Sequence, residues 1–157
     1  MGLKTAITPI GVSEGGAEAS PEALFSDFKD TQGRFRTLSL FYESRHPDYK
    51  SYFTTKKYDH EGHISLYRKY MEIADPTEYQ VAQRLFGSWD HWKALNASKW
   101  FTEMVTPWRE ELKVKLESER YHEMKKVAKS KGPAGPAASK WLAERYGEKK
   151  LKFMHAA

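Results

Sequence analysis

Apolar residues recur every three or four positions along most of this chain, which is the spacing of one face of an amphipathic α-helix. Segments with this spacing cover residues 21–32, 35–45, 64–74, 76–86, 89–96, 98–105, 107–130 and 137–146. Residues 49–63 instead mix aromatic, β-branched and polar side chains without a period, so we expect a loop with at most a short extended piece. The pattern predicts an all-α fold.

The sharpest boundary signal is Asp75-Pro76-Thr77-Glu78. An aspartate, a proline at the first helical position and a glutamate three residues after the aspartate are typical of a capped helix start. That helix should end at Gly87, and Ser88 should cap a second short helix. Two helices separated by only two residues predict a helix–turn–helix unit. The side chains of the second helix that we expect to face the core are Trp89, Trp92 and Leu95.

The longest helical segment, residues 107–130, would be about 36 Å long. Thr106-Pro107 marks either its start or a kink within a longer helix. Its apolar side chains form a narrow stripe among charged residues, and such a stripe on a long helix needs a partner to cover it. The stripe consists of Trp108, Leu112, Leu116, Met124 and Val127.

A Gly- and Pro-containing turn, residues 131–136, leads from the long helix into a last short helix that carries Trp141. We therefore expect an antiparallel hairpin of a long and a short helix. The predicted parts of the chain are a flexible arm (1–20), an N-terminal helical domain (21–105), the hairpin (106–147) and a basic tail (148–157).

Composition excludes several classes of protein. The 157 residues include no Cys, which excludes disulfides, thiolate zinc sites and a cysteine nucleophile, and fits a reducing compartment. No apolar run approaches the roughly 18 residues of a membrane span, and no secretory signal is visible, so we expect a soluble protein.

The net charge of +5 is concentrated near the C-terminus. Residues 1–97 hold twelve basic and thirteen acidic side chains, residues 98–121 five of each, and residues 122–157 nine basic and three acidic. This asymmetry is typical of a protein that meets a polyanion or an acidic protein surface, and it also fits a solvated helix face followed by a tail.

Catalytic signatures are missing, since the sequence has no P-loop, G-x-S-x-G or S-x-x-K motif. The segment Asp59-His60-Glu61-Gly62-His63 is similar to H-E-x-x-H, but its spacing is one residue shorter and Gly62 disfavours a helix. We expect an exposed polar loop there, and neither enzymatic activity nor a metal or cofactor.

The helix–turn–helix unit is the best functional motif, because the second helix of such units enters the major groove of DNA. Ser, Asn and Lys side chains can bond base edges or phosphates, whereas Asp90 repels phosphate. The alternative interpretation is a purely structural helix pair. Two features favour it: this region is nearly neutral, and Ala82 and Gly87 stand five rather than the usual four residues apart. The candidate DNA-binding residues are Ser88, His91, Lys93, Asn96, Lys99, Arg84, Lys56 and Lys57.

Over about residues 60–147 the chain resembles the small terminase subunits of tailed bacteriophages. The residues that carry the resemblance are Ser65-Leu66-Tyr67, Asp75-Pro76-Thr77-Glu78-Tyr79, Ala82, Gly87-Ser88-Trp89, His91-Trp92, Trp108-Arg109-Glu110-Glu111-Leu112 and the closing Ala137-Ala138 with Lys140-Trp141-Leu142-Ala143-Glu144.

The resemblance implies a subunit that binds double-stranded viral DNA in the bacterial host cytoplasm, forms a ring of about eight to eleven copies and regulates the large terminase subunit, which holds the ATPase and nuclease. The implied ring contacts are Trp108, Leu112, Leu116, Met124, Val127 and Trp141. The implied partner-binding tail contains Lys149, Lys150, Lys152 and Phe153. Two other classes stay open: a dimeric helix–turn–helix transcription regulator, and an aromatic-rich adaptor that binds no nucleic acid.

Overall fold

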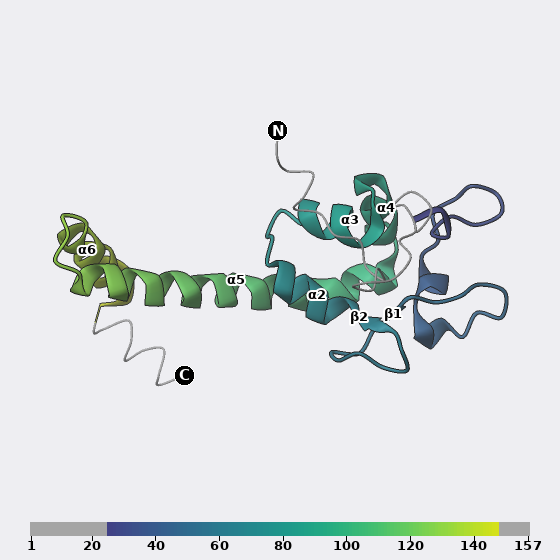
Figure 1. Cartoon of the computed structure of the whole chain (residues 1–157), viewed down its shortest axis with the longest axis horizontal. Helices are drawn as coiled ribbons and strands as arrows, with labels where there is room; N and C mark the ends of the chain where they lie inside the picture. The colour runs from purple at the N-terminus through teal and green to yellow at the C-terminus, as the bar shows by residue number, and fades with distance from the viewer. Residues whose placement is uncertain (1–24, 148–157) are drawn as a thin grey trace, which may run out of the picture. The chain divides into compact units, whose positions relative to one another are not determined.

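The computed structural model describes residues 25–147, and within this range the chain is mainly helical (Figure 1). The chain divides into two compact units, residues 1–110 and 111–157, and the division falls inside the long helix α5 (Lys99–Lys129). The expectation of a mainly helical protein is confirmed, with a two-stranded sheet in addition. None of the helices in the described range is long and apolar enough to cross a membrane. The predicted arm and basic tail lie outside the described residues.

The first described part of unit 1 has short 3₁₀ helices where a helix was predicted over 35–45. These are η2 (Leu38–Leu40) and η3 (Tyr42–Ser44), and the backbone between them is extended at Phe41. The buried guanidinium of Arg36 ties this segment to parts of the chain before and after it. It donates at 2.6–2.9 Å to the carbonyls of Asp27, Ser39 and Lys50.

Two short parallel strands follow, β1 (Phe53–Thr54) and β2 (Ile64–Ser65). They supply the extended piece expected near residues 49–63, and β2 occupies the first two positions of the helix predicted over 64–74. The backbones of His60 and His63 exchange hydrogen bonds of 3.0 and 2.8 Å and close a turn in the connecting loop.

Three short helices then form the centre of unit 1: α2 (Leu66–Ile73), α3 (Tyr79–Phe86) and α4 (Trp89–Asn96). Gly87 ends α3 as predicted, with φ at 70°, in the left-handed region that glycine adopts without steric cost. The Ser88 hydroxyl caps α4 as predicted by accepting from the His91 amide at 3.3 Å.

Helix α3 begins at Tyr79 rather than at Pro76. Glu78, directly before it, has φ at 67°, which is not a helical conformation. Asp75 nevertheless receives backbone amides as expected, because Oδ2 accepts from Gln80 at 2.8 Å and Oδ1 from Thr77 at 3.0 Å.

Helix α5 runs without interruption through Pro107, so of the two expected readings the proline within a longer helix is correct. Pro107 has no N–H to donate to the preceding turn. The hydroxyls of Thr102 and Thr106 also bond earlier carbonyls of the helix, at 3.0 Å to Lys99 and at 2.6 Å to Thr102. Residue 106 is therefore not a break in secondary structure.

An aromatic core holds unit 1 together. Ring centroids lie 5.1 Å apart for Phe53 and Phe86 and 5.3 Å apart for Trp92 and Phe101, in the tilted and edge-on arrangements that aromatic pairs favour. The side chains of this core that are at most 2% exposed include Phe28, Phe41, Phe53, Phe86, Trp92 and Phe101.

Unit 2 contains the C-terminal part of α5 and α6 (Gly135–Tyr146), which begins two residues earlier than predicted. Figure 1 shows α6 beside the end of α5. Arg145 Nε donates to Glu117 Oε1 at 2.6 Å, and the rings of Tyr121 and Tyr146 lie 5.0 Å apart. The buried residues within 111–147 are Leu112, Gly135 and Ala138.

Candidate nucleic-acid interface

Glu78 joins the helices of unit 1 through one buried carboxylate. It accepts hydrogen bonds from the Tyr70 hydroxyl at 2.7 Å, from Trp92 Nε1 at 3.1 Å and from Arg109 Nε at 2.7 Å. Burial disfavours the charged form, but the hydrogen bonds from Arg109, Tyr70 and Trp92 outweigh it and hold the pKa of Glu78 below its ordinary value. Glu78 therefore fixes α4 relative to α2 and α5. Its position in the sequence predicted that its side chain would help to cap α3, but the side chain makes no capping hydrogen bond.

Asn96, half-buried at the end of α4, belongs to the same network. Its Oδ1 accepts from Arg109 Nη2 at 2.7 Å, and its Nδ2 donates to the carbonyl of Trp92 at 2.8 Å. Both ends of the amide are engaged within the unit. A base contact by Asn96, which the sequence analysis expected, would require these two bonds to break.

The expectation that His91 faces DNA is wrong. Its side chain is 1% exposed, its ring stacks on Phe35 at 4.7 Å, and Nε2 lies 2.6 Å from the carbonyl oxygen of Arg36. Burial lowers the pKa of His91 to about 4, so the ring is neutral at physiological pH. The position could have been recognised, because His91 stands four residues before the core residue Leu95 and so shares its helix face.

The exposed side of α4 carries balanced charge. Lys93 Nζ lies 3.4 Å from Asp90 Oδ1, and the Lys93 side chain is 61% exposed. Just after α4, the 89% exposed side chain of Lys99 pairs with Glu103 at 3.7 Å. Lys93 and Lys99 are accessible, and each already has an acidic neighbour.

Arg84 on α3 has the opposite character. Its Nε is buried and lacks a hydrogen-bond partner among the residues that the structure describes. A buried guanidinium nitrogen without an acceptor is unusual in folded proteins. Arg84 as a whole is half-buried, and its Nε does not reach the surface where DNA would bind.

An exposed aromatic pair lies at the starts of α3 and α4. Tyr79 is 50% exposed and Trp89 is 37% exposed, and their ring centroids are 6.0 Å apart. Trp89 was expected in the core, but the first position of α4 directs it to the surface. The sequence does not reveal this pair, because exposed and buried aromatic residues recur at the same helical spacing.

Lys56 and Lys57 lie in the loop between β1 and β2, each over an aromatic ring. Lys56 Nζ is 5.9 Å from the centroid of Tyr58, and Lys57 Nζ is 4.9 Å from that of Tyr67. The carboxylate of Asp59 in this loop is held by Arg68 at 2.8 Å. Across residues 25–147 no three His, Asp or Glu side chains come together as metal ligands.

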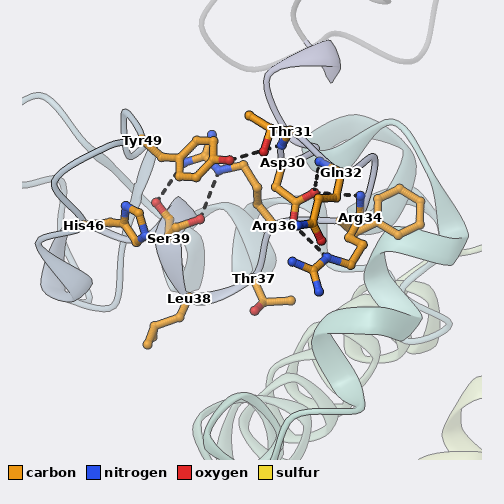
Figure 2. Close-up of a pocket in the computed structure, with 11 residues that line it drawn as sticks. Asp30, Thr31, Gln32, Arg34, Arg36, Thr37, Leu38, Ser39, His46 and Tyr49 are labelled. Carbon is orange, nitrogen blue, oxygen red and sulfur yellow. Dashed lines mark hydrogen bonds and ion pairs between the residues drawn. The ribbon is translucent and has the colours of Figure 1, made fainter.

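A pocket of about 350 Å³ opens near the start of the described chain (Figure 2). Arg36 and Tyr49 form one part of its wall, with the guanidinium carbon 4.7 Å from the ring centroid. At its rim, Asp30 binds Arg34 at 3.1 Å. The charged groups of the pocket are thus bonded to one another or to backbone carbonyls, which gives them a structural role.

The predicted oligomer contacts divide into two groups. Trp108 is 5% exposed and packs on Tyr67 and Tyr70 with centroids 5.5 and 5.7 Å apart, and Leu112 is 2% exposed. These two residues are covered by their own chain, so their assignment to a subunit interface is corrected. The members that stay partly exposed are Leu116, Met124, Val127 and Trp141.

Two guanidinium groups lie near the ring of Trp141, with Arg120 at 5.1 Å and Arg145 at 5.5 Å from the ring centroid. The predicted tail contacts Lys149, Lys150, Lys152 and Phe153 lie outside the described residues.

No protein-family model, curated protein or solved structure matches the chain.

Proposed function

We propose that this protein is a non-enzymatic DNA-binding subunit that self-associates through unit 2 and serves a genome-packaging motor, as small terminase subunits of tailed bacteriophages do. In this proposal α3 and α4 form the helix–turn–helix unit, and α5 and α6 form the hairpin of the assembly. The large terminase subunit would supply the ATPase and nuclease.

The observation that carries the proposal is the thin core of unit 2. Its described residues, 111–147, bury only Leu112, Gly135 and Ala138, and Val114 is 70% exposed. Unit 2, residues 111–157, is close to the size of about 40 residues below which a domain usually needs a disulfide, a metal or a partner chain to stay folded. The sequence has no Cys to form a disulfide. Sister subunits are therefore the natural cover for the stripe.

The α3–α4 pair supports the DNA-binding part of the proposal. A two-residue turn separates the helices, and the Glu78 network fixes α4 firmly in place. An exposed second helix on a rigid support is what major-groove binding requires. The same feature favours a dimeric transcription regulator as the second candidate, and copy number distinguishes the two.

Replacement of two partly exposed stripe residues tests self-association. Leu116→Asp with Met124→Asp should dissolve the assembly, because each carboxylate would be buried without a partner at the subunit interface. The matched control is Leu38→Asp with Tyr58→Asp, which changes two residues that are 49% and 61% exposed on unit 1. If both double variants keep the mass of the parent protein, the stripe is not the interface.

Binding to a labelled DNA duplex, followed by fluorescence anisotropy at several salt concentrations, tests the other half of the proposal. We expect binding that weakens steadily with salt, because released counterions contribute to the affinity. A protein that forms its assembly but does not bind the duplex at low salt would support the adaptor class instead.

A further inference from the structure

The charge of unit 2 is concentrated where α5 ends. Lys125, Lys126, Lys129 and Lys131 are all exposed, and they fall within seven consecutive positions. We call these four residues the lysine cluster. The surrounding segment, residues 124–143, holds five lysines and neither Asp nor Glu.

This positive charge is not neutralised nearby. Among the described residues, no carboxylate forms an ion pair with any member of the cluster; Lys125 lies over the ring of Tyr121 at 5.4 Å. The C-terminal end of a helix carries about −0.5 of a charge, which offsets about one-eighth of four positive charges. Like charges at positions i and i+4, such as Lys125 and Lys129, also destabilise a helix. The cluster therefore keeps most of its positive charge in the free protein and attracts an external anion.

The surroundings of the cluster favour a phosphate backbone over an acidic protein. Protein interfaces usually draw their affinity from aromatic or other apolar anchors. The exposed large apolar residues of the described chain lie elsewhere, at Leu38, Tyr58, Tyr79, Trp89 and Val114. The residues interspersed with the last lysines of the cluster, Ser130 and Gly132, are small or polar and exposed, which lets a backbone of phosphates approach closely.

We propose that the lysine cluster binds the phosphate backbone of double-stranded DNA without reading its sequence. The inference rests on the proposed DNA-binding function and adds to it the place of the electrostatic contact. By contrast, Lys93 and Lys99 beside α4 each have an acidic partner. In an assembly the cluster would be repeated in every copy, so that many weak contacts add up along the DNA.

Two variants of the full-length chain, with four substitutions each, test the inference. The first changes the lysine cluster to Gln at all four positions. The matched control changes Lys56, Lys57, Lys93 and Lys99 to Gln, which removes the same charge from the predicted DNA-binding lysines of unit 1. Affinity for a labelled duplex is measured between about 50 and 200 mM salt, with circular dichroism to verify that both variants are folded.

Four lysines on four phosphates contribute about 3.6 to the slope of log affinity against log salt, or about 150-fold over this salt range. We expect the salt slope of the cluster variant to be smaller than that of the parent by most of this amount. The control should keep the part of the slope that comes from the cluster, whether or not it loses a part of its own. A cluster variant with the salt slope of the parent would overturn the inference and leave the proposed function standing, since the parent still binds DNA. If the parent itself fails to bind the duplex but binds polyglutamate through the same lysines, the partner is an acidic polypeptide, and both proposals fail.

Discussion

Mild acid should destabilise unit 1 through His91. The ring is buried, and Nε2 lies at hydrogen-bonding distance from the carbonyl oxygen of Arg36. A second proton on the ring would therefore create a positive charge that water cannot solvate. The positive groups Lys29 and Arg36 also disfavour that charge. Burial is the main reason that the pKa of His91 falls from 6.5 to about 4 on folding.

The sign and the size of the effect follow from proton linkage. The unfolded chain binds the proton more tightly than the folded chain, so the stability that neutral His91 contributes is complete above the unfolded pKa and declines as pH falls from 6.5 to about 4. Each pH unit in this window removes about 1.4 kcal/mol, which amounts to about 2 kcal/mol between about pH 7 and pH 5. Carboxylates with lowered pKa values, such as Glu78, lose their contribution only below about pH 4.5.

The assay is urea unfolding followed by tryptophan fluorescence at a fixed protein concentration, with His91→Gln as the matched variant. Gln keeps a side-chain donor for the carbonyl of Arg36 but does not titrate. We expect the free energy of unfolding of the parent to fall by about 2 kcal/mol over this pH range and that of the variant to fall by less than about 0.5 kcal/mol. Equal losses in both proteins would refute the reasoning, because another group would then carry the pH dependence.

Two further substitutions test the supports of α3 and α4. Glu78→Gln should lower the free energy of unfolding by about 2–3 kcal/mol, because it leaves Arg109 without its charged partner; the 35% exposure of the Arg109 side chain reduces this cost. In urea unfolding, the exposed control Glu72→Gln should lose less than about 0.5 kcal/mol. Similar losses in the two variants would contradict the stabilising role of the Glu78 network. Gly87→Ala should destabilise by about 1–3 kcal/mol more than Gly62→Ala in thermal unfolding, because both glycines have positive φ but only an added methyl group at Gly87 would overlap an aromatic ring. Equal losses for the two alanine variants would remove that ring from the account.

Local signals in the sequence located the end of α3 and the start of α4 but not the long-range contacts. Gly87 and Ser88 could be predicted because positive φ and hydroxyl capping are chosen by single residues. The segment 35–45 misled, because its apolar spacing fits a helix while the distant carbonyls bound by Arg36 decide its backbone. Glu78 has a capping position in the sequence, and only the fold brings Arg109 to it across 31 residues.

The candidate surfaces show the same limit. Residue type predicted a DNA contact for His91, but its helix face places it in the core. The stripe was predicted as one surface, yet Trp108 packs on Tyr67 and Tyr70 within its own unit. The spacing of apolar residues along α5 does not reveal this contact, because it is made with a different helix. The lysine cluster was accessible to sequence analysis, since a long segment without Asp or Glu can be read directly.

Native mass spectrometry of the full-length protein at micromolar concentration tests the central claim most directly. The claim is that Leu116, Met124, Val127 and Trp141 are covered by sister subunits. With a chain mass of 18.2 kDa, eight to eleven copies give about 145–200 kDa, and this is the predicted mass. A single species at 18.2 kDa would contradict the account.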